Sequence, residues 1–299
     1  MQIKIGTRVS KLALIQAEEV RQALLVSHVN LNPEELVLVP IKTTGDKILN
    51  KNLYDVGGKG LFIKEIEEAL LDKSIDIAVH SMKDMPAFLP EQLVVNCILE
   101  REDPRDAFLS FSGGDIASLS KGASVGTCAP RRVAQFLHLR PDVQIVTIRG
   151  NVDTRIEKLE QHLVDATILA VAGLKRCQIP SEKYTIISED DMLPAIAQGA
   201  IGVECRKTDD KILSLLSKIN HQTSFAAITA ERGFLEGLNA SCKTPIAAYA
   251  TISGDQLYLR CLVSSLDGKK ITKTERLGKI KDGYDLGLDA ATQLKNLLY

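Results

Sequence analysis

Hydrophobic runs typical of strands alternate with segments of helical hydrophobic spacing along most of the chain. Short apolar runs such as IKIGT, ELVLVPIKT and SIDIAV predict buried strands. The segment LFIKEIEEALLDK has apolar residues at helical spacing, which predicts a helix with one buried face formed by Ile63, Ile66, Leu70 and Leu71. Because alternating strands and helices pack as layers around largely parallel sheets, the pattern predicts an α/β fold.

The pattern changes at two places further along the chain. A second alternating unit begins after the charged stretch EREDPRD at residues 100–106. From about Ser224 the order becomes helix, loop, β-meander and closing helix, which is typical of an α+β arrangement. The length of 299 residues also suits about two or three domains of ordinary size.

Charge and cysteine usage narrow the class of protein. With 37 basic and 38 acidic residues the net charge is −1, so no global charge recruits nucleic acid or an anionic membrane. The six cysteines form no C-x-x-C pair, and Cys97, Cys205 and Cys261 lie in apolar strand-like runs. This usage is typical of buried thiols in a reducing compartment, not of disulfides or a zinc site. The chain opens directly on a strand and has no apolar run of about 18 residues, so we expect a cytoplasmic protein.

Basic and hydroxyl residues follow the predicted strands in four loops, at residues 6–10, 80–84, 126–132 and 149–155. In open parallel sheets, ligands collect at the carboxyl ends of strands, where helix N-termini favour anions. Any single basic residue there is usually a solvated surface group. Together the loops predict a binding site for carboxylates or phosphates, formed by Arg8, Lys83, Arg131, Arg132, Arg149 and Arg155.

Arg131 and Arg132 are the most informative of these residues because they open a predicted helix. Cations at a helix N-terminus oppose the helix dipole by about 0.3–1 kcal/mol each. A bound anion would offset that penalty.

Asp84 is the candidate acid or base. It follows a buried strand among turn residues and cations, where a carboxylate can transfer protons or stabilise a developing positive charge. The alternative is a surface ion pair with Lys83. The nearby His80 is expected to be a satisfied core histidine, and the remaining histidines show no metal-binding spacing.

Three cysteines lie in predicted loops and are candidate nucleophiles. Lys243 adjoins Cys242, and an adjacent ammonium group favours the nucleophilic thiolate. Cys128 has two arginines nearby, and Cys177 is the third candidate. The residues alone leave the choice among the three open.

Several long segments together resemble the porphobilinogen deaminase family. They occur in the order of the family and cover most of residues 3–262. The most distinctive are VHSMKDMP and RGNVDTR, accompanied by IGTRVSKLALIQ, KTTGDKI, VGGKGLFIKEIEEALLDK, REDPRDAFLS, VGTCAPRR, ILAVAGLKR and AIAQGAIGVECR.

The resemblance implies two similar doubly wound α/β lobes of the type 2 periplasmic-binding-protein kind, plus a smaller α+β C-terminal domain. The first domain is expected to comprise residues 1–99 and 200–218, the second 100–199, and the third 219–299. The chain would cross between the lobes near Glu100–Asp106 and Leu193–Gly199.

The resemblance also implies the reaction. A transferase of this family joins four porphobilinogen molecules head to tail with loss of ammonia, and water then releases hydroxymethylbilane for haem biosynthesis. The growing chain is primed by a covalently bound dipyrromethane cofactor. We expect no metal, no nucleic-acid or membrane partner, and a monomer in the cytoplasm.

The family roles fall on residues of this chain that match its motifs. Asp84 would be catalytic, and Cys242 would carry the dipyrromethane through a thioether. The other expected cofactor-binding residues are Lys83, Arg131, Arg132, Asp84, Ser10 and Thr127. The expected substrate-binding residues are Arg8, Arg149, Arg155, Arg176, Phe62, Gln16, Gln198 and Lys59.

Two departures from the family pattern affect this site. Ala240 and Ser241 stand where the family commonly has two glycines, so a positive φ there would be strained. Ala129 replaces a serine, which removes one side-chain hydrogen bond worth ~1 kcal/mol. The rival hypotheses are a non-catalytic protein that binds small anions and an inactive member of the family.

Overall fold

The computed structural model describes residues 2–47, 62–241 and 244–297. Two predicted site residues, Lys59 and Cys242, therefore lie outside the described residues. The chain folds as two compact units: Met1–Arg101 with Ala200–Phe225, and Glu102–Gly199 with Ala226–Tyr299. The further division into three domains with the boundaries given above stays a prediction.

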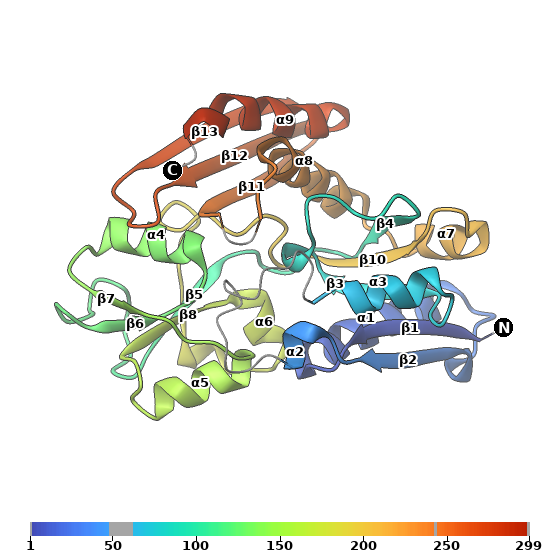
Figure 1. Cartoon of the computed structure of the whole chain (residues 1–299), viewed down its shortest axis with the longest axis horizontal. Coiled ribbons are helices and arrows are strands. Elements are labelled where there is room, and N and C mark those ends of the chain that lie inside the picture. Colours follow the sequence, from blue (N-terminus) through green and yellow to red (C-terminus); the bar gives the residue numbers. More distant parts are fainter. Residues whose placement is uncertain (1, 48–61, 242–243, 298–299) are drawn as a thin grey trace. The chain divides into compact units, whose positions relative to one another are not determined.

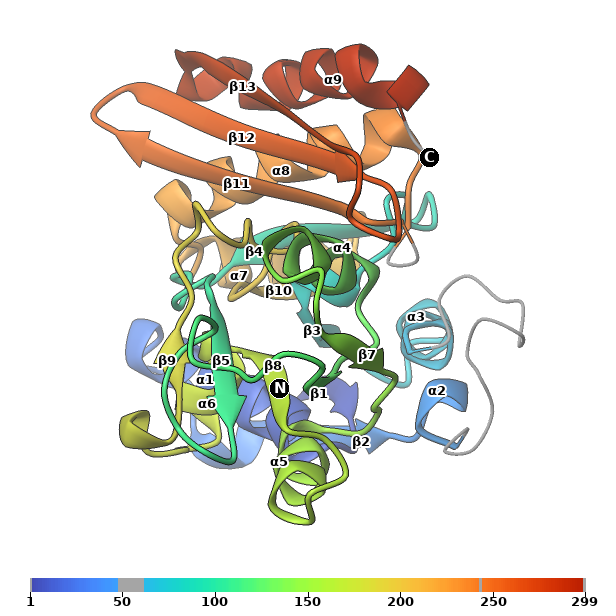
Figure 2. The same ribbon diagram turned by 90° about the vertical axis from the view of Figure 1, so that its left-hand side faces the viewer.

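The first unit contains a five-stranded sheet with the order β2-β1-β3-β10-β4, which can be followed in Figures 1 and 2. β1 pairs in parallel with β2 and β3, whereas β10 runs antiparallel to β3 and β4. The strands are β1 (Ile3–Arg8), β2 (Leu36–Ile41), β3 (Ile77–Ser81), β4 (Leu93–Ile98) and β10 (Ile201–Arg206).

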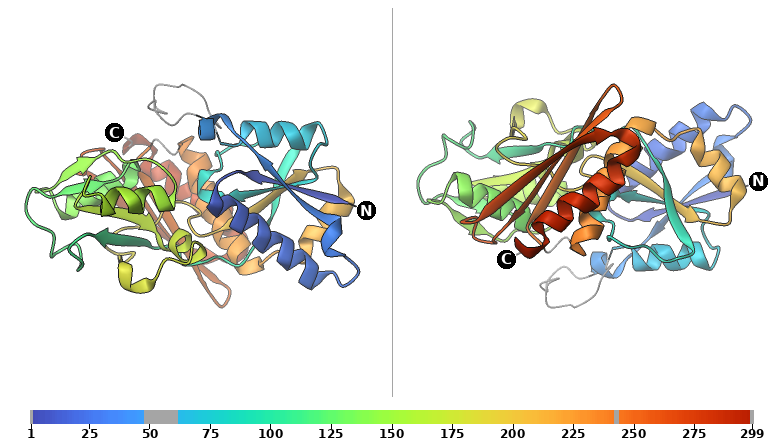
Figure 3. Two further views of the ribbon diagram at one scale, coloured as in Figure 1. Left: turned by 90° about the horizontal axis from the view of Figure 1, so that it is seen from below. Right: turned by 90° about the horizontal axis from the view of Figure 1, so that it is seen from above.

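Helices cover both faces of this sheet because successive strand residues point to opposite sides. Ile77 and Val79 of β3 pack in the core cluster with α1 (Lys11–Ser27) and α7 (Asp210–Ser217), while Ala78 packs against α3 (Lys64–Leu71). Figure 3 shows α1 and α3 on opposite sides of the sheet. The short helix α2 (Thr44–Lys47) follows β2.

The predicted helix near residue 66 is confirmed as α3, with one correction to its buried face. Ile63, Ile66 and Leu70 are buried, but Leu71 is 43% exposed. Leu71 lies about 100° around the helix from Leu70, which turns it to the edge of the apolar stripe. Glu67, one turn after Ile63, lies on the side that the periodicity assigns to the core.

The second unit contains a sheet of the same design, with the order β7-β6-β8-β5-β9. One face packs against α4, and the other against α5 and α6. In each sheet the fourth position holds a strand antiparallel to the third. The elements are β5 (Asp106–Ser110), β6 (Ser124–Gly126), α4 (Pro130–Leu139), β7 (Gln144–Val146), α5 (Val152–Glu160), β8 (Ala166–Ala170), α6 (Val171–Arg176) and β9 (Thr185–Ile186).

The last part of the second unit is an antiparallel three-stranded sheet with helices along it (Figure 2). It comprises α8 (Gln222–Leu238), β11 (Ile246–Ser253), β12 (Gln256–Ser264), β13 (Ile271–Lys279) and α9 (Gly283–Leu294). The matching strand orders and this smaller sheet confirm the predicted fold of two similar doubly wound lobes plus an α+β part. Within the described ranges, no helix has both the length and the apolar character needed to cross a bilayer.

Gly199 lies where the chain leaves the second unit. Its φ is +89°, and the Glu102 N–H donates to its carbonyl at 3.3 Å. A Cβ at this position would lie 2.3 Å from the backbone oxygen of Glu102. Glycine is therefore required both by the backbone conformation and by the approach of the neighbouring segment.

Gly199→Ala is expected to lower the free energy of unfolding by at least about 2 kcal/mol, because left-handed strain and the collision with the Glu102 carbonyl add. Gly254→Ala is the matched control: Gly254 also has a positive φ (+60°), but no atom lies within 4 Å of its added Cβ. Denaturant unfolding of both variants separates the two effects. Equal losses in the two variants would contradict the collision.

Candidate active site

The carboxyl ends of the parallel strands β1 and β3 lie at one edge of the first sheet, and a pocket opens there. Arg8 ends β1, and Lys83 and Asp84 follow β3 in a short 3₁₀ turn (Met82–Asp84). Six residues predicted from the sequence line the pocket: Arg8, Ser10, Gln16, Phe62, Lys83 and Asp84. His80 and Ser81 also line it, although they were not predicted to be site residues.

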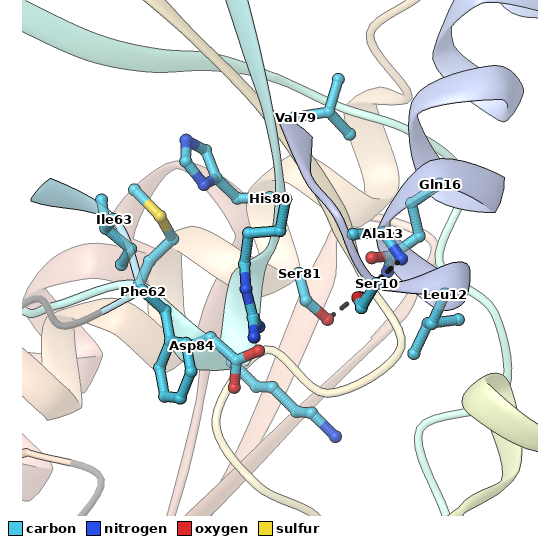
Figure 4. Close-up of a pocket in the computed structure, with 13 residues that line it drawn as sticks. Ser10, Leu12, Ala13, Gln16, Phe62, Ile63, Val79, His80, Ser81 and Asp84 are labelled. Carbon is cyan, nitrogen blue, oxygen red and sulfur yellow. Dashed lines mark hydrogen bonds between the residues drawn. The ribbon is translucent and has the colours of Figure 1, made fainter. Parts of the chain in front are cut away.

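Asp84 is the exposed carboxylate of this pocket. In Figure 4 it lies beside Phe62, across the pocket from Ser10 and Gln16. Among the residues that the structure describes, its side chain makes no hydrogen bond or ion pair. The carboxylate is therefore available to a ligand, as a catalytic acid or base requires.

The Arg8 guanidinium is held on two sides. It forms an ion pair with Asp46, and its centre lies 4.1 Å from the centroid of the Phe62 ring. Its Nε is buried and has no hydrogen-bond partner within the described part of the chain. Burial alone would raise the pKa of Asp46, but the hydrogen bond and charge of Arg8, with a hydrogen bond from Thr43, hold that pKa below its ordinary value.

Asp46 was not predicted as a site residue. It lies just after β2, which ends at the same edge of the sheet as β1, and this is the signal that could have found it.

Two hydroxyl groups order the other side of the pocket. The Ser10 side chain accepts from the Ala13 N–H at 3.3 Å and so caps the N-terminus of α1. The buried Gln16 side chain donates to Ser81 Oγ at 3.4 Å. These contacts fix the first turn of α1 against the end of β3.

His80 is a core histidine, as predicted. Its side chain is 5% exposed, and Nε2 lies 2.9 Å from a carboxylate oxygen of the fully buried Glu204. Figure 4 shows the ring directed away from Asp84. His80 therefore contributes to the wall of the pocket without pointing its imidazole into it.

In the second unit, Arg131 and Arg132 are buried in the first turn of α4 and share one partner, the fully buried Asp106. Arg131 Nη1 donates to Asp106 at 2.6 Å and Arg132 Nη2 at 2.8 Å. Gln198 joins them, with its Nε2 2.9 Å from Asp106 Oδ1. The anion that offsets the dipole penalty at this helix N-terminus is thus a side chain of the protein itself.

Asp106 was also missed, although it is an acidic residue at the start of a buried apolar strand, DAFLS. Burial by itself would raise the pKa of Asp106. The charges and hydrogen bonds of Arg131 and Arg132 outweigh that effect and hold the pKa far below its ordinary value. The carboxylate is therefore charged at neutral pH.

Of the remaining predicted residues of the second unit, Thr127 follows β6 directly and Arg149 lies in the loop after β7, whereas Arg155 lies in α5 and Arg176 ends α6. Thr127 Oγ1 accepts from the Ala129 N–H at 3.3 Å, so the backbone of Ala129 is engaged within the loop. Arg155 donates to the Gly150 carbonyl at 2.9 Å and to Cys128 Sγ at 3.7 Å. Arg176 Nη1 donates to the Gly199 carbonyl at 3.2 Å.

Arg149 differs from its neighbours in one respect. Its Nε is buried and lacks a hydrogen-bond partner among the described residues. Since a buried N–H without a partner is unfavourable, this group is suited to an acceptor on a ligand.

The described thiols are mostly inert. Cys97, Cys205 and Cys261 are buried in strands as predicted, and burial raises the pKa of Cys97 to about 12 and that of Cys205 to about 11. Cys177 was expected in a loop but caps the C-terminus of α6 and is buried. Of the described cysteines, Cys128 alone is partly exposed.

In the segment before Cys242, the positive φ expected at Ala240 or Ser241 occurs at Asn239 instead. Asn239, just after α8, has a φ of +49°, whereas Ala240 and Ser241 are not among the described residues with positive φ. Asparagine tolerates this left-handed conformation better than alanine or serine does. Ala240 and Ser241 therefore enter the loop without that penalty.

Among the residues that the structure covers, no group of three or more His, Cys, Asp or Glu side chains could hold a metal ion. Arg8 and Arg149, whose buried Nε groups have no partner among the described residues, could hold a carboxylate-bearing molecule.

Comparison with known proteins gives a consistent result over the whole chain. The family model "Porphobilinogen deaminase, dipyromethane cofactor binding domain" matches residues 3–214, and "Porphobilinogen deaminase, C-terminal domain" matches residues 225–296. The chain is 50% identical over 297 residues to the chloroplastic porphobilinogen deaminase of Pisum sativum, covering 98% of this chain and 80% of that protein. It is 47% identical over 301 residues to the porphobilinogen deaminase of Orientia tsutsugamushi, covering 100% of both.

Among solved structures, the chain is similar to ytmK of Bacillus subtilis, a probable extracellular-binding protein of an amino-acid ABC transporter. The identity is 12% and the TM-score 0.44, over 73% of this chain and 90% of that one.

Proposed function

The chain belongs to the porphobilinogen deaminase family, and from this we propose that it joins four porphobilinogen molecules head to tail, with loss of ammonia, to give hydroxymethylbilane. It is a transferase of tetrapyrrole synthesis, active as a monomer in the cytoplasm. The observation that carries the proposal is the exposed Asp84 carboxylate in a pocket that also presents Arg8 and Lys83.

Asp84 acts on the positive charge of the reaction. Loss of ammonia from the aminomethyl group of porphobilinogen leaves a cationic pyrrole, and a carboxylate beside the ring nitrogen stabilises that charge. Since no described side chain engages Asp84, its oxygens can accept the pyrrole N–H directly. A simple anion-binding protein would gain nothing from a carboxylate at this place, because it repels the ligand.

Arg8 and Lys83 bind the carboxylates of the substrate. Each porphobilinogen carries an acetate and a propionate group, and the buried Arg8 Nε has no hydrogen-bond partner among the described residues. The Asp46 ion pair and the Phe62 ring hold the guanidinium in place before the substrate arrives, so less side-chain freedom is lost on binding.

The residues present also fit the dipyrromethane cofactor of the family. When bound, this group supplies the terminal pyrrole to which porphobilinogen units are added. Thr127, Arg131 and Arg132 would hold its carboxylates, and Cys242 would be the attachment point through a thioether. Burial of four of the described cysteines supports this choice, because buried thiols are poor nucleophiles.

Arg131 and Arg132 differ in what they can offer to such a carboxylate. Among the described residues, Arg131 donates four of its five N–H groups, to Asp106, Leu193 and Gln198. Arg132 donates three, to Asp106 and the Ile168 carbonyl. Arg132 therefore has the greater capacity for a ligand.

Intact mass spectrometry of the purified protein tests this function. We expect a mass two pyrrole units above that of the sequence and a red colour with Ehrlich's reagent. Cys242→Ser should lose both signals, because no thioether can form, whereas Cys128→Ser should keep them. An unmodified mass in protein that still consumes porphobilinogen would refute the tethered cofactor, and loss of the signals only in Cys128→Ser would move the attachment to that thiol.

A further inference from the structure

Three titratable side chains from three elements lie together behind the pocket: His80 of β3, Glu204 of β10 and Glu67 of α3. His80 Nε2 and Glu204 Oε2 are 2.9 Å apart, and their side chains are 5% and 0% exposed. Oε1 of Glu204 and Oε1 of Glu67 are both buried without a hydrogen-bond partner among the described residues. These groups have no place in the chemistry assigned to Asp84, so their presence in the interior needs an explanation.

The fold accounts for their proximity. In the antiparallel pair β3–β10, His80 lies opposite Gly202 and Ala78 opposite Glu204, so His80 and Glu204 are diagonal neighbours on one face of the sheet. α3 covers this same face, since Ala78 packs with Ile66 and Leu70. Glu67 follows Ile66 on α3; the residue is partly buried, and its Oε1 is shielded from solvent.

An apolar interior cannot hold two charged carboxylates with a single imidazole at low cost. Burial and then the charge of Glu204 raise the pKa of Glu67 to about 7, although His80 acts in the opposite direction. The group therefore gains or loses one proton near neutral pH, and Glu67 is the site where this happens.

Other charged groups around α3 are engaged elsewhere. Arg206 of β10 donates to the Leu70 and Ile75 carbonyls and pairs with Asp76 and Asp209. At the start of α3, Glu65 accepts from Thr44. From β1, Arg8 faces Asp46, and β4 contributes the apolar Leu93 to this face.

The group of three is coupled to the pocket through β3. His80 lines the pocket as well as contacting Glu204, and the turn that carries Lys83 and Asp84 begins two residues later. A negative charge that appears on Glu67 lies in a medium of low dielectric, where its field is weakly screened. That field opposes the binding of an anion to Arg8 and Lys83.

We propose that His80, Glu204 and Glu67 form a buried proton-exchanging cluster whose charge tunes the affinity of the pocket for its dicarboxylate substrate. With Glu67 protonated the pocket binds the substrate more tightly, and with Glu67 ionised it binds more weakly. Glu67 and Glu204 are positioning residues, since they act on the substrate only through the field and through β3. The identity of the substrate rests on the proposed function, whereas the proton exchange does not.

Glu67→Gln tests the link to the pocket because it keeps the shape of the side chain and removes its charge change. Between about pH 6 and about pH 8, KM for porphobilinogen is expected to rise about three- to tenfold more in the unaltered protein than in Glu67→Gln. The value of kcat should change little, because Glu67 does not touch the substrate. Glu68→Gln is the matched control, because this neighbour on α3 is 60% exposed and pairs with Lys64 at the surface. A KM profile that is the same in all three proteins would overturn the coupling.

Glu204→Gln provides a second variant in case the first one folds poorly. It removes the like charge that helps to raise the pKa of Glu67, so the rise in KM should move to lower pH. A rise that stays at the same pH would overturn the cluster as proposed.

The pH dependence of stability tests the proton exchange without any substrate. The pKa of Glu67 is raised in the folded protein from 4.5 to about 7, so the folded state binds more protons than the unfolded chain in this interval. The resulting stabilisation is complete below about pH 4.5 and is lost as the pH rises to about 7. Measured against Glu67→Gln, the unfolding midpoint of the unaltered protein should fall over that interval and then level off.

This second readout separates two kinds of failure. A protein that does not consume porphobilinogen but shows the pH-dependent midpoint would contradict the proposed function and keep the cluster. A protein that consumes porphobilinogen, with a midpoint difference independent of pH, would keep the function and contradict the cluster.

Discussion

Asp84→Asn is expected to fold normally and to lose at least about a hundredfold in kcat with porphobilinogen. Asparagine preserves the size of the side chain and one acceptor oxygen but cannot compensate positive charge on a pyrrole. The fold should not suffer, because Asp84 is exposed and no described residue forms a hydrogen bond or ion pair with it. The prediction therefore separates a chemical role from a structural one.

Steady-state kinetics and denaturant unfolding of the same preparation check this result. Asp84→Glu is the matched variant, which keeps the charge but moves it by one methylene. Its kcat should lie between those of the unaltered protein and Asp84→Asn. Turnover of Asp84→Asn at the unaltered rate would refute the assignment. A loss of turnover accompanied by a large fall in the unfolding midpoint would show that Asp84 supports the fold instead.

Asp106→Asn is expected to lower the free energy of unfolding by about 3–5 kcal/mol, because it leaves two buried guanidinium groups without their counter-charge. Both arginines are at most 7% exposed at the side chain, so water cannot replace the lost carboxylate. Because Arg131 and Arg132 stay buried and charged after the substitution, their desolvation penalty remains without the attraction that offset it.

The control for Asp106 is an ion pair of similar geometry at the surface. Asp190 lies 2.6 Å from Arg260, but its side chain is 81% exposed. Asp190→Asn should therefore change the free energy of unfolding by less than about 1 kcal/mol. Denaturant unfolding of the two variants provides the comparison. If both lose less than about 1 kcal/mol of unfolding free energy, burial does not make the Asp106 cluster important for stability.

The outcome for Asp106 also bears on the function of Arg131 and Arg132. Their guanidinium groups are oriented by a carboxylate of the protein, so any ligand carboxylate would meet donors that are already held in place. An Asp106 variant that is stabilised by other substitutions could keep its fold, but its two arginines would no longer be held in this orientation. Cofactor loading of a stabilised Asp106 variant, measured by intact mass, would then fall even where the fold is retained.

Much of the site could be predicted from the sequence because its residues lie in loops that directly follow strands, and the apolar runs of those strands mark where the loops begin. Arg8, Lys83 and Asp84 were assigned from their place after apolar runs, and Ser10 from the family resemblance; all four line one pocket. The two acids that hold the arginines, Asp46 and Asp106, were not. Asp46 follows the predicted strand ELVLVPIKT, and Asp106 ends the charged stretch EREDPRD, but their arginine partners lie 38 and 25 residues away in the sequence.

The local spacing of apolar and polar residues determined the alternation of strands and helices, and with it the α/β class. This holds because side-chain direction repeats every two residues in a strand and every 3.6 in a helix, whatever the rest of the chain does. The tertiary structure alone decided which buried charges meet. His80 and Glu204 are 124 residues apart, and Arg131 and Asp106 are 25 apart. Their pairing depends on which strands are neighbours and in what register, and no local pattern encodes that.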